Sequence, residues 1–435
     1  SHFAYFADQR ARAQLKSWLL TSPGQEPPKG LGFVHKTPPP AVLAADRLRS
    51  AIPAPPPKPT AEVVVVPGIF ESMLVQNGKP AWFDYAALAT DGLEPLEGAS
   101  GVLSAGLVPE LYEKLVRQLT SRGYQVTPLH YDWRKSLTDA ASSLADTLEL
   151  ALVQADTPIH VMAHGAGCLV VALAFAGARG LAARLAARGG RSLLLAPPAE
   201  GSVWASALLE GKGPAFDTLV LLNPTGDADA VKRTLNSFLS LRELASGDKG
   251  EGAAIRATAA KAAFSVGDSF AISGYGVHTP SSLIDGQLLY HEAGDGMVLL
   301  PGAGSATPAL FAGVQQFYVR AAHGNLLDNL EVISSIGPLL ENRSAPQLST
   351  SCPPVTSPAA QPLDRFVLYP TAEETLNTLF VRQPPREEEI TVSVQVTHDD
   401  LRNASHPVIV GHYATDTIVG AERALDEALQ GALSR

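Results

Sequence analysis

The 435-residue sequence has few cysteines, few charged residues and no long, uninterrupted apolar run. Its two cysteines, Cys168 and Cys352, cannot form a disulfide framework, and such sparse usage is typical of a reducing cytosol, so a cytoplasmic location is expected. Lys and Arg number 33 and Asp and Glu 43, for a formal charge of −10 without basic runs, which argues against a nucleic-acid partner. No internal repeat is evident.

The most apolar stretch, residues 159–178, contains two histidines and ends before an arginine. A transmembrane helix needs about 20 predominantly apolar residues, so this stretch is better explained as a buried strand followed by a helix, and no transmembrane segment is expected. We expect neither a cofactor nor a metal. The chain begins Ser-His rather than Met, so its natural N-terminus is expected upstream, where a targeting segment would escape notice.

The length predicts more than one domain. Residues 1–60 contain three proline clusters and are interpreted as an N-terminal arm. The main domain is placed at residues 61–342. A linker rich in Ser, Pro, Thr and Ala follows at 343–363, and then a small α+β unit at 364–435, which is complete or the start of a further domain.

Periodic patterns within 61–342 alternate between strand and helix. The valine run 63–66 is typical of a strand covered on both faces, as in a parallel sheet. Helices are predicted at 109–121 and 137–154, with further core strands at 126–131 and 314–319. This order indicates an α/β fold with a mostly parallel sheet and helices on both faces.

The chain is organised around residues 159–171, a short apolar run, a cluster of small residues and an Ala-rich stretch. This is the strand, sharp turn and helix of a nucleophile elbow, whose usual pattern is small-x-Ser-x-Gly. Here the pattern reads Ala-His-Gly-Ala-Gly, so Gly165 occupies the tip and a serine is missing. An ordinary buried strand–turn–helix is the alternative interpretation.

Partners for an elbow follow in the order nucleophile, acid, histidine. Asp295 lies between two glycines after a short strand, and His323 follows the last core strand. Backbone N–H groups of Phe70, in a glycine turn after the first core strand, and of Ala166 are the candidate oxyanion-hole donors. Taken singly, each is also explained as an ordinary loop, a common turn or a structural histidine.

Several segments resemble the lecithin:cholesterol acyltransferase branch of the α/β-hydrolases. They are Pro-Gly-Ile-Phe-Glu-Ser at 67–72, Tyr-Asp-Trp-Arg at 131–134, the elbow, Leu-Leu-Leu-Ala-Pro-Pro-Ala-Glu-Gly-Ser at 193–202, Ser-Phe-Leu-Ser-Leu-Arg-Glu-Leu at 237–244, Gly-Asp-Gly-Met-Val at 294–298 and His-Gly-Asn-Leu-Leu at 323–327. The resemblance covers about residues 61–342. It implies that Asp295 orients His323, that residues 200–285 form a cap, and that the ligand is an ester or an acyl lipid.

The C-terminal unit is predicted to contain strands at 365–369, 389–397 and 407–410 and a helix at 420–433. Residues 407–413 and 420–426 resemble segments of large bacterial proteins that carry a caspase-like (CHAT) peptidase domain. That resemblance implies a bacterial, multidomain protein, with other domains or proteins as partners of this unit.

The predicted chemistry is that of a serine hydrolase, a lipase, esterase or acyltransferase, without its attacking atom. Loss of a triad nucleophile costs about 10⁶ in kcat, so negligible turnover is expected. Cys168 is predicted to point into packing, Ser72 is a remote substitute nucleophile, and His164 is predicted to face away from the substrate. A natural loss and a laboratory replacement of serine both fit. The alternative function is a non-catalytic binding or regulatory module of a larger protein.

Overall fold

A computed structural model describes residues 58–98, 100–300, 310–352, 372–383 and 420–430. The chain divides into two compact units, one that ends at Pro384 and one that begins at Pro385. In the second unit the described element is helix α16 (Gly420–Ala428), at the start of the predicted helix 420–433. Almost all of the predicted arm, the part of the predicted linker from residue 353 on, and the predicted C-terminal strands lie outside the described residues.

The first unit is built on a six-stranded parallel sheet in the order β11-β8-β7-β6-β1-β5. β1 lies between β5 and β6, with Val63 opposite Val126 on one side and His160 on the other. The strands are β1 (Ala61–Val66), β5 (Tyr124–Pro128), β6 (Ile159–His164), β7 (Ser192–Leu195), β8 (Ser269–Tyr275) and β11 (Gln315–Arg320). This architecture, with its strand–turn–helix after β6, is the predicted α/β-hydrolase fold.

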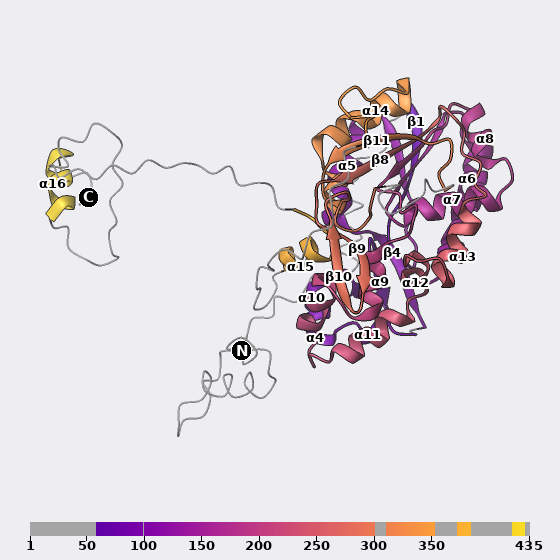
Figure 1. Cartoon of the computed structure of the whole chain (residues 1–435). Coiled ribbons are helices and arrows are strands. Elements are labelled where there is room, and N and C mark those ends of the chain that lie inside the picture. The colour runs from indigo at the N-terminus through magenta and orange to yellow at the C-terminus, as the bar shows by residue number, and fades with distance from the viewer. Residues whose placement is uncertain (1–57, 99, 301–309, 353–371, 384–419, 431–435) are drawn as a thin grey trace. The chain divides into compact units, whose positions relative to one another are not determined.

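Helices cover both faces of this sheet (Figure 1). α5 (Pro109–Ser121) and α14 (Leu330–Asn342) pack together on one side. The other side carries α6 (Leu137–Gln154), α7 (Gly167–Gly177) and α8 (Leu181–Ala187). α5 and α6 have the predicted bounds: Pro109 starts the former, and the Ser136 hydroxyl caps the latter by accepting from Thr138 N–H.

Five helices are inserted between β7 and β8. They are α9 (Val203–Glu210), α10 (Pro214–Leu222), α11 (Ala228–Ser237), α12 (Leu239–Leu244) and α13 (Gly250–Ala259). The range 200–285 predicted for a cap therefore needs correction, because β8 within it is a central strand. β8 reads Ser-Phe-Ala-Ile-Ser-Gly-Tyr, whose small and polar residues break the apolar run by which a buried strand is recognised.

Two smaller antiparallel sheets flank the central one. The first consists of β2 (Ser72–Gln76), β3 (Lys79–Trp82) and β4 (Val102–Leu107). The short helices α4 (Tyr85–Asp91) and η1 (Glu94–Leu96) lie in the connection between β3 and β4. The second is a hairpin of β9 (Thr279–Ile284) and β10 (Gln287–His291). The short strand predicted before Asp295, residues 288–290, lies in β10. It therefore belongs to this hairpin and not to the central sheet.

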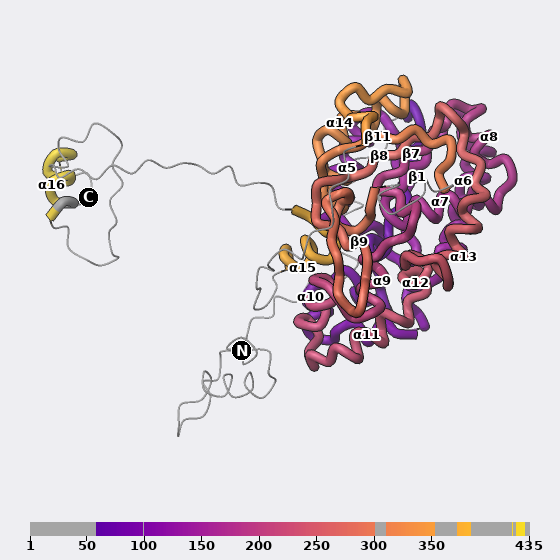
Figure 2. Tube along the Cα trace, viewed as in Figure 1, coloured from indigo at the N-terminus to yellow at the C-terminus, as the bar shows by residue number. Residues whose placement is uncertain are grey.

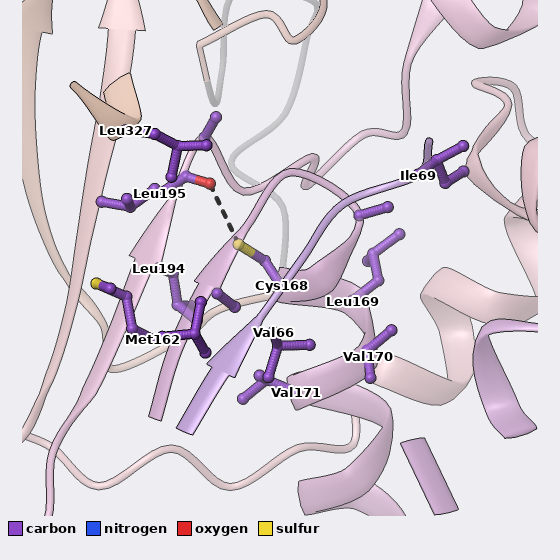
Figure 3. Packing of buried hydrophobic residues seen from close by; sticks show 14 of the residues in the cluster. Val66, Ile69, Met162, Cys168, Leu169, Val170, Val171, Leu194, Leu195 and Leu327 are labelled. Atoms are coloured by element: carbon purple, nitrogen blue, oxygen red, sulfur yellow. Dashed lines mark hydrogen bonds between the residues drawn. The ribbon is translucent and has the colours of Figure 1, made fainter. Parts of the chain in front are cut away.

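The core is densest where β6 turns into α7. α7 is apolar all round and is buried from Gly167 to Phe175, as expected for a helix enclosed by protein on every side. Figure 3 shows Cys168 among Val66, Leu194 and Leu195, with its thiol donating to the Leu195 carbonyl at 3.4 Å. Burial raises the pKa of the Cys168 thiol well above its ordinary value, so this cysteine is a packing residue.

Candidate active site

The predicted elbow tip has a left-handed backbone conformation. Gly165 lies at φ +51°, between the last residue of β6 and the start of α7. Gly167 allows the close approach of helix and strand, because a Cβ there would lie 2.5 Å from the Val66 carbonyl oxygen. A Cβ added to Gly165 would point at the His323 imidazole, 3.0 Å from Nε2. The tip and the predicted base therefore face each other.

Asp295 and His323 are brought together as a buried pair. His323 Nδ1 lies 2.8 Å from Asp295 Oδ2, and the His323 backbone N–H donates to the Asp295 carbonyl at 2.8 Å. The other carboxylate oxygen accepts from the backbone N–H groups of Met297 and Val298. With its carboxylate fixed in this way, Asp295 can hold the imidazole in the tautomer that presents Nε2 to the tip.

The turn after β1 is fixed by the Tyr-Asp-Trp-Arg segment. The Tyr131 hydroxyl donates to the Pro67 carbonyl at 3.0 Å, and the Trp133 indole donates to the Ser72 carbonyl at 2.9 Å. The Ser72 hydroxyl accepts from the Tyr131 N–H, so this side chain is engaged in holding the loop. The motif thus acts through the backbone of the turn that is expected to supply an oxyanion donor.

Phe70 is the strained residue of that turn, at φ +67°. Its ring is buried against Trp82 and Trp133, at centroid distances of 5.0 and 4.6 Å, and its carbonyl accepts from the Trp82 indole at 2.6 Å. Such a backbone conformation costs about 1–3 kcal/mol and persists only where its surroundings enforce it. The ring lies in the core, and only a backbone role in the site is open to Phe70.

A narrow hollow of about 20 Å³ joins these parts. It is lined by Gly68, Ile69, Glu71, Gly165, Ala166, Ser202, Trp204, Leu244, Met297, Val298 and His323. Four of the five sequence-predicted site positions meet here or act directly on it: Gly165, Ala166 and His323 in the lining, and Asp295 behind His323. For Phe70, both chain neighbours line the hollow. Its assignment, like that of Ala166, as an oxyanion donor stays a prediction.

A second buried charge pair lies behind the elbow, and the sequence reasoning missed its acid. Glu71 accepts from His164 Nδ1 at 2.7 Å, from the Gly68 N–H at 2.6 Å and from the Tyr112 hydroxyl. His164 Nε2 lies 3.1 Å from the His323 carbonyl oxygen. His164 therefore turns toward Glu71 and braces the loop of the predicted base.

The pair is charged on both sides. Burial would raise the pKa of Glu71, but the charge and hydrogen bond of His164 outweigh it and hold that pKa below its ordinary value. Burial would lower the pKa of His164, but Glu71 raises it on balance. Burial, together with Glu71, raises the pKa of Tyr112 well above its ordinary value, so its hydroxyl remains a donor. Glu71 follows the glycine turn and His164 precedes the tip, 93 residues later, and no signal in the sequence pairs the two.

Glu71, His164 and His323 also place potential ligand atoms within 4.8 Å of one another. Both Glu71 oxygens are already occupied by protein donors, and both His164 nitrogens face protein oxygens. A metal ion would have to displace these hydrogen bonds, so the donor set fits a structural hydrogen-bond network better than a metal centre.

A segment distant in sequence packs against the loops that carry Asp295 and His323. After α15 (Ala372–Leu379), the carbonyl of Phe380 accepts from the Gly324 N–H at 3.0 Å, and Arg382 pairs with Asp328 at 3.0 Å. Gly296 and Gly324 have no room for a Cβ, which would lie 2.2 Å from the Val381 side chain and 2.5 Å from that of Arg382. We call residues 376–383 the C-terminal strap. It was predicted to lie in a separate unit, yet it packs against both loops of the site.

Comparisons with known proteins found one family model and several solved structures that are similar to this chain. The family model of lecithin:cholesterol acyltransferase matches residues 89–225. Among solved structures, the chain is similar to the mature lipase BlEst2 of Bacillus licheniformis (16% identity, 66% of this chain and 95% of that one, TM-score 0.36). It is also similar to the carboxylesterase CesB of Bacillus subtilis (11% identity, 70% and 97%, TM-score 0.32). No curated protein sequence matches the chain.

Among the described helices, no single one is long and apolar enough to cross a membrane; α7 and α8 meet that test only as a pair bent by 98°.

The sheet order, the elbow after β6 and the match over residues 89–225 lead to one conclusion. The chain has the α/β-hydrolase fold, and one segment of it is similar to lecithin:cholesterol acyltransferase.

Proposed function

We propose that this chain binds an ester or acyl-lipid ligand in the hydrolase site and does not turn it over, because Gly165 supplies no nucleophile. The observation that carries the proposal is the arrangement of Gly165, His323 and Asp295. An oriented imidazole faces the one position of the fold where a serine hydroxyl would attack. On this proposal, the one atom that the site lacks is the serine oxygen.

Glycine suits the tip once attack is no longer required. A non-glycine residue at φ +51° costs about 1–3 kcal/mol, whereas glycine adopts this conformation without penalty. Backbone donors in the hollow survive the loss of a side chain, so a carbonyl or carboxylate can still be bound there. Catalysis loses about 10⁶ with the nucleophile, which leaves roughly 10³–10⁴ over water from binding and the oxyanion hole.

The test restores the nucleophile. Gly165→Ser is compared with the unchanged chain and with Gly165→Ser/His323→Ala, by hydrolysis of short and long p-nitrophenyl esters and by intact mass after a fluorophosphonate probe. We expect one covalent adduct and ester turnover from Gly165→Ser, and their loss in the double variant. Gly165→Ala controls for the added Cβ, since it makes the same contact with His323 without an oxygen.

A non-catalytic binding or regulatory module is the second candidate function. It is favoured by the position of His323 Nε2, which is 3.0 Å from where a Cβ would lie and so partly occupies the space of a serine side chain. If Gly165→Ser folds, binds esters and still forms no adduct, the site is built for binding and the triad assignment fails.

A further inference from the structure

A second hollow, of about 200 Å³, adjoins the hydrolase site. Its walls come from α9, the start of α10, the β9–β10 hairpin and the C-terminal strap, which all contribute to its lining. Figure 2 shows α15 beside α10 and this hairpin. Trp204 lines both hollows, and Gly296 of the second adjoins Met297 of the first. We call this second hollow the lateral groove.

The lateral groove has apolar walls and basic side chains. Trp204, Leu208, Leu288 and Val381 supply apolar surface. Its ionisable side chains, apart from the Tyr290 hydroxyl, are Lys212, His278 and Arg382, all of them basic, in a chain whose formal charge is −10. Lys212 and Arg382 carry positive charge, and no Asp or Glu is among the described lining residues, which favours an anionic ligand.

Lys212 is the basic residue with its charge still free to act. Arg382 pairs with Asp328 at 3.0 Å, and His278 lies 3.9 Å from Glu292. Within the described residues, no ion pair involves Lys212. Its backbone is held by the cap of α9, where Gly211 adopts φ +74° and the Lys212 N–H donates to the Ala207 carbonyl at 2.8 Å. The flexible side chain therefore starts from a fixed point.

From Trp204 to Glu210 the chain follows α9, which at 1.5 Å per residue corresponds to ~9 Å, and Lys212 lies two residues beyond the helix end. A ligand that reaches both must be elongated. A small anion such as phosphate would leave the apolar walls uncovered, and a neutral lipid would leave the lysine unpaired. The arrangement suits a long apolar chain with one anionic group.

We infer that the lateral groove binds an acyl lipid with an anionic head group: its chain lies on the apolar walls past Trp204, and its negative group is held by Lys212 with Arg382 nearby. This inference rests on the proposed function, since it names the class of ligand that the hydrolase site receives. Lysine is a compact charge on a flexible stem, suited to a carboxylate or a phosphate without strict geometry.

The test measures binding of a long-chain carboxylate and its neutral counterpart. Full-length protein is titrated with cis-parinaric acid, a fluorescent fatty acid, and with its methyl ester. Because Lys212 is exposed, we expect Lys212→Gln to weaken acid binding by roughly three- to tenfold and to leave the ester unchanged. Lys212→Arg should retain the affinity. Arg117→Gln on α5, a matched loss of one exposed positive charge, should change neither.

Further measurements distinguish a charge effect from a steric effect, and a fatty-acid site from a site for a lipid with an anionic head group. About 1 M salt, where the screening length is ~3 Å, should weaken the acid and spare the ester. Leu288→Trp, which fills the groove, should weaken both. Displacement of the bound acid by lysophosphatidylglycerol in preference to lysophosphatidylcholine is expected for an anionic-lipid site. Equal displacement by the two, or no effect of Lys212→Gln, would overturn the inference.

The two proposals fail separately. Adduct formation by Gly165→Ser does not depend on Lys212, so a reactive Gly165→Ser with no charge preference in the groove removes only the anionic-lipid inference. A charge-selective groove in a protein whose Gly165→Ser variant stays unreactive removes the inactivated-hydrolase proposal and leaves a lipid-binding module.

Discussion

The buried pair of Glu71 and His164 offers the sharpest test of how the site is held. In Glu71→Ala, three donors lose their acceptor at once: the Gly68 N–H, the Tyr112 hydroxyl and protonated His164. Each buried unsatisfied group costs about 1–3 kcal/mol, and removal of one partner of a buried ion pair costs about 3–5 kcal/mol. We therefore expect Glu71→Ala to lower the free energy of unfolding by at least ~3 kcal/mol.

Glu71→Gln is the matched control, because it keeps the shape and can satisfy a neutral imidazole. The glutamine N–H₂ would donate to His164 Nδ1, while Nε2–H donates to the His323 carbonyl. We expect a loss of about 1–2 kcal/mol, since only the charge is removed. Urea denaturation followed by circular dichroism gives both values. Equal stability of Glu71→Ala and the unchanged chain would refute the role given to this network.

The pH dependence of the same comparison follows from the two pKa shifts. The pKa of Glu71 is lowered from 4.5, so its stabilisation is present above that pH and is lost as the pH falls through the lower folded value. The pKa of His164 is raised from 6.5, so its stabilisation is present below that pH and is lost as the pH rises through the higher folded value. The stability gap between the unchanged chain and Glu71→Gln should therefore be widest at about pH 4.5–6.5, and a gap independent of pH would contradict the ion pair.

Three further substitutions test the surroundings. Burial lowers the pKa of His160 from 6.5 to about 4. The free energy of unfolding should therefore fall by about 3 kcal/mol in total as the pH drops from 6.5 to 4, because protonation of His160 favours the unfolded chain. His160→Asn should remove this part of the pH dependence of stability. Phe380→Ala should cost about 3–5 kcal/mol in urea denaturation if the C-terminal strap belongs to the folded unit, and an unchanged midpoint would show that it does not. Gly167→Ala should lower the free energy of unfolding by about 1–3 kcal/mol or more, because its Cβ would lie 2.5 Å from a backbone oxygen. Gly177→Ala on the same helix is the control: its Cβ meets open space, so the melting temperature should stay unchanged or rise.

The sequence predicted local features well, because local chemistry determines them. α5 and α6 keep their predicted bounds since helical periodicity and a proline or serine at the start are sufficient signals. The elbow, Asp295 and His323 could be recognised because each lies in a short motif at the end of a strand. Their mutual distance could not be predicted from spacing, and it emerges only when β8 and β11 are laid beside β7.

What the sequence did not show depends on contacts between remote segments. β8 has no continuous apolar run, and it is a strand because its neighbours β7 and β11 enclose it. The strap reaches Gly324 from more than 50 residues away, and nothing in its composition names that partner. Glu71 looked like an ordinary loop carboxylate until folding placed His164 beside it, since a buried charge becomes plausible only when its counter-charge is known.

The geometry of the tip limits what restoration of a serine can achieve. A Cβ on Gly165 would lie 3.0 Å from His323 Nε2, closer than an ordinary van der Waals contact, so the imidazole must retreat by a few tenths of an ångström before a serine fits. Its freedom to do so is restricted, because Asp295 accepts a hydrogen bond from Nδ1 of the ring, and Glu71 holds the loop through His164. Loosening that brace in Gly165→Ser/Glu71→Gln therefore has two opposed effects: it eases the retreat of His323 and it weakens the base's orientation. If the tight contact limits catalysis, the double variant should react faster with the fluorophosphonate than Gly165→Ser does; if orientation limits it, the double variant should react more slowly. Equal rates would mean that the Glu71–His164 pair supports the fold without acting on the site.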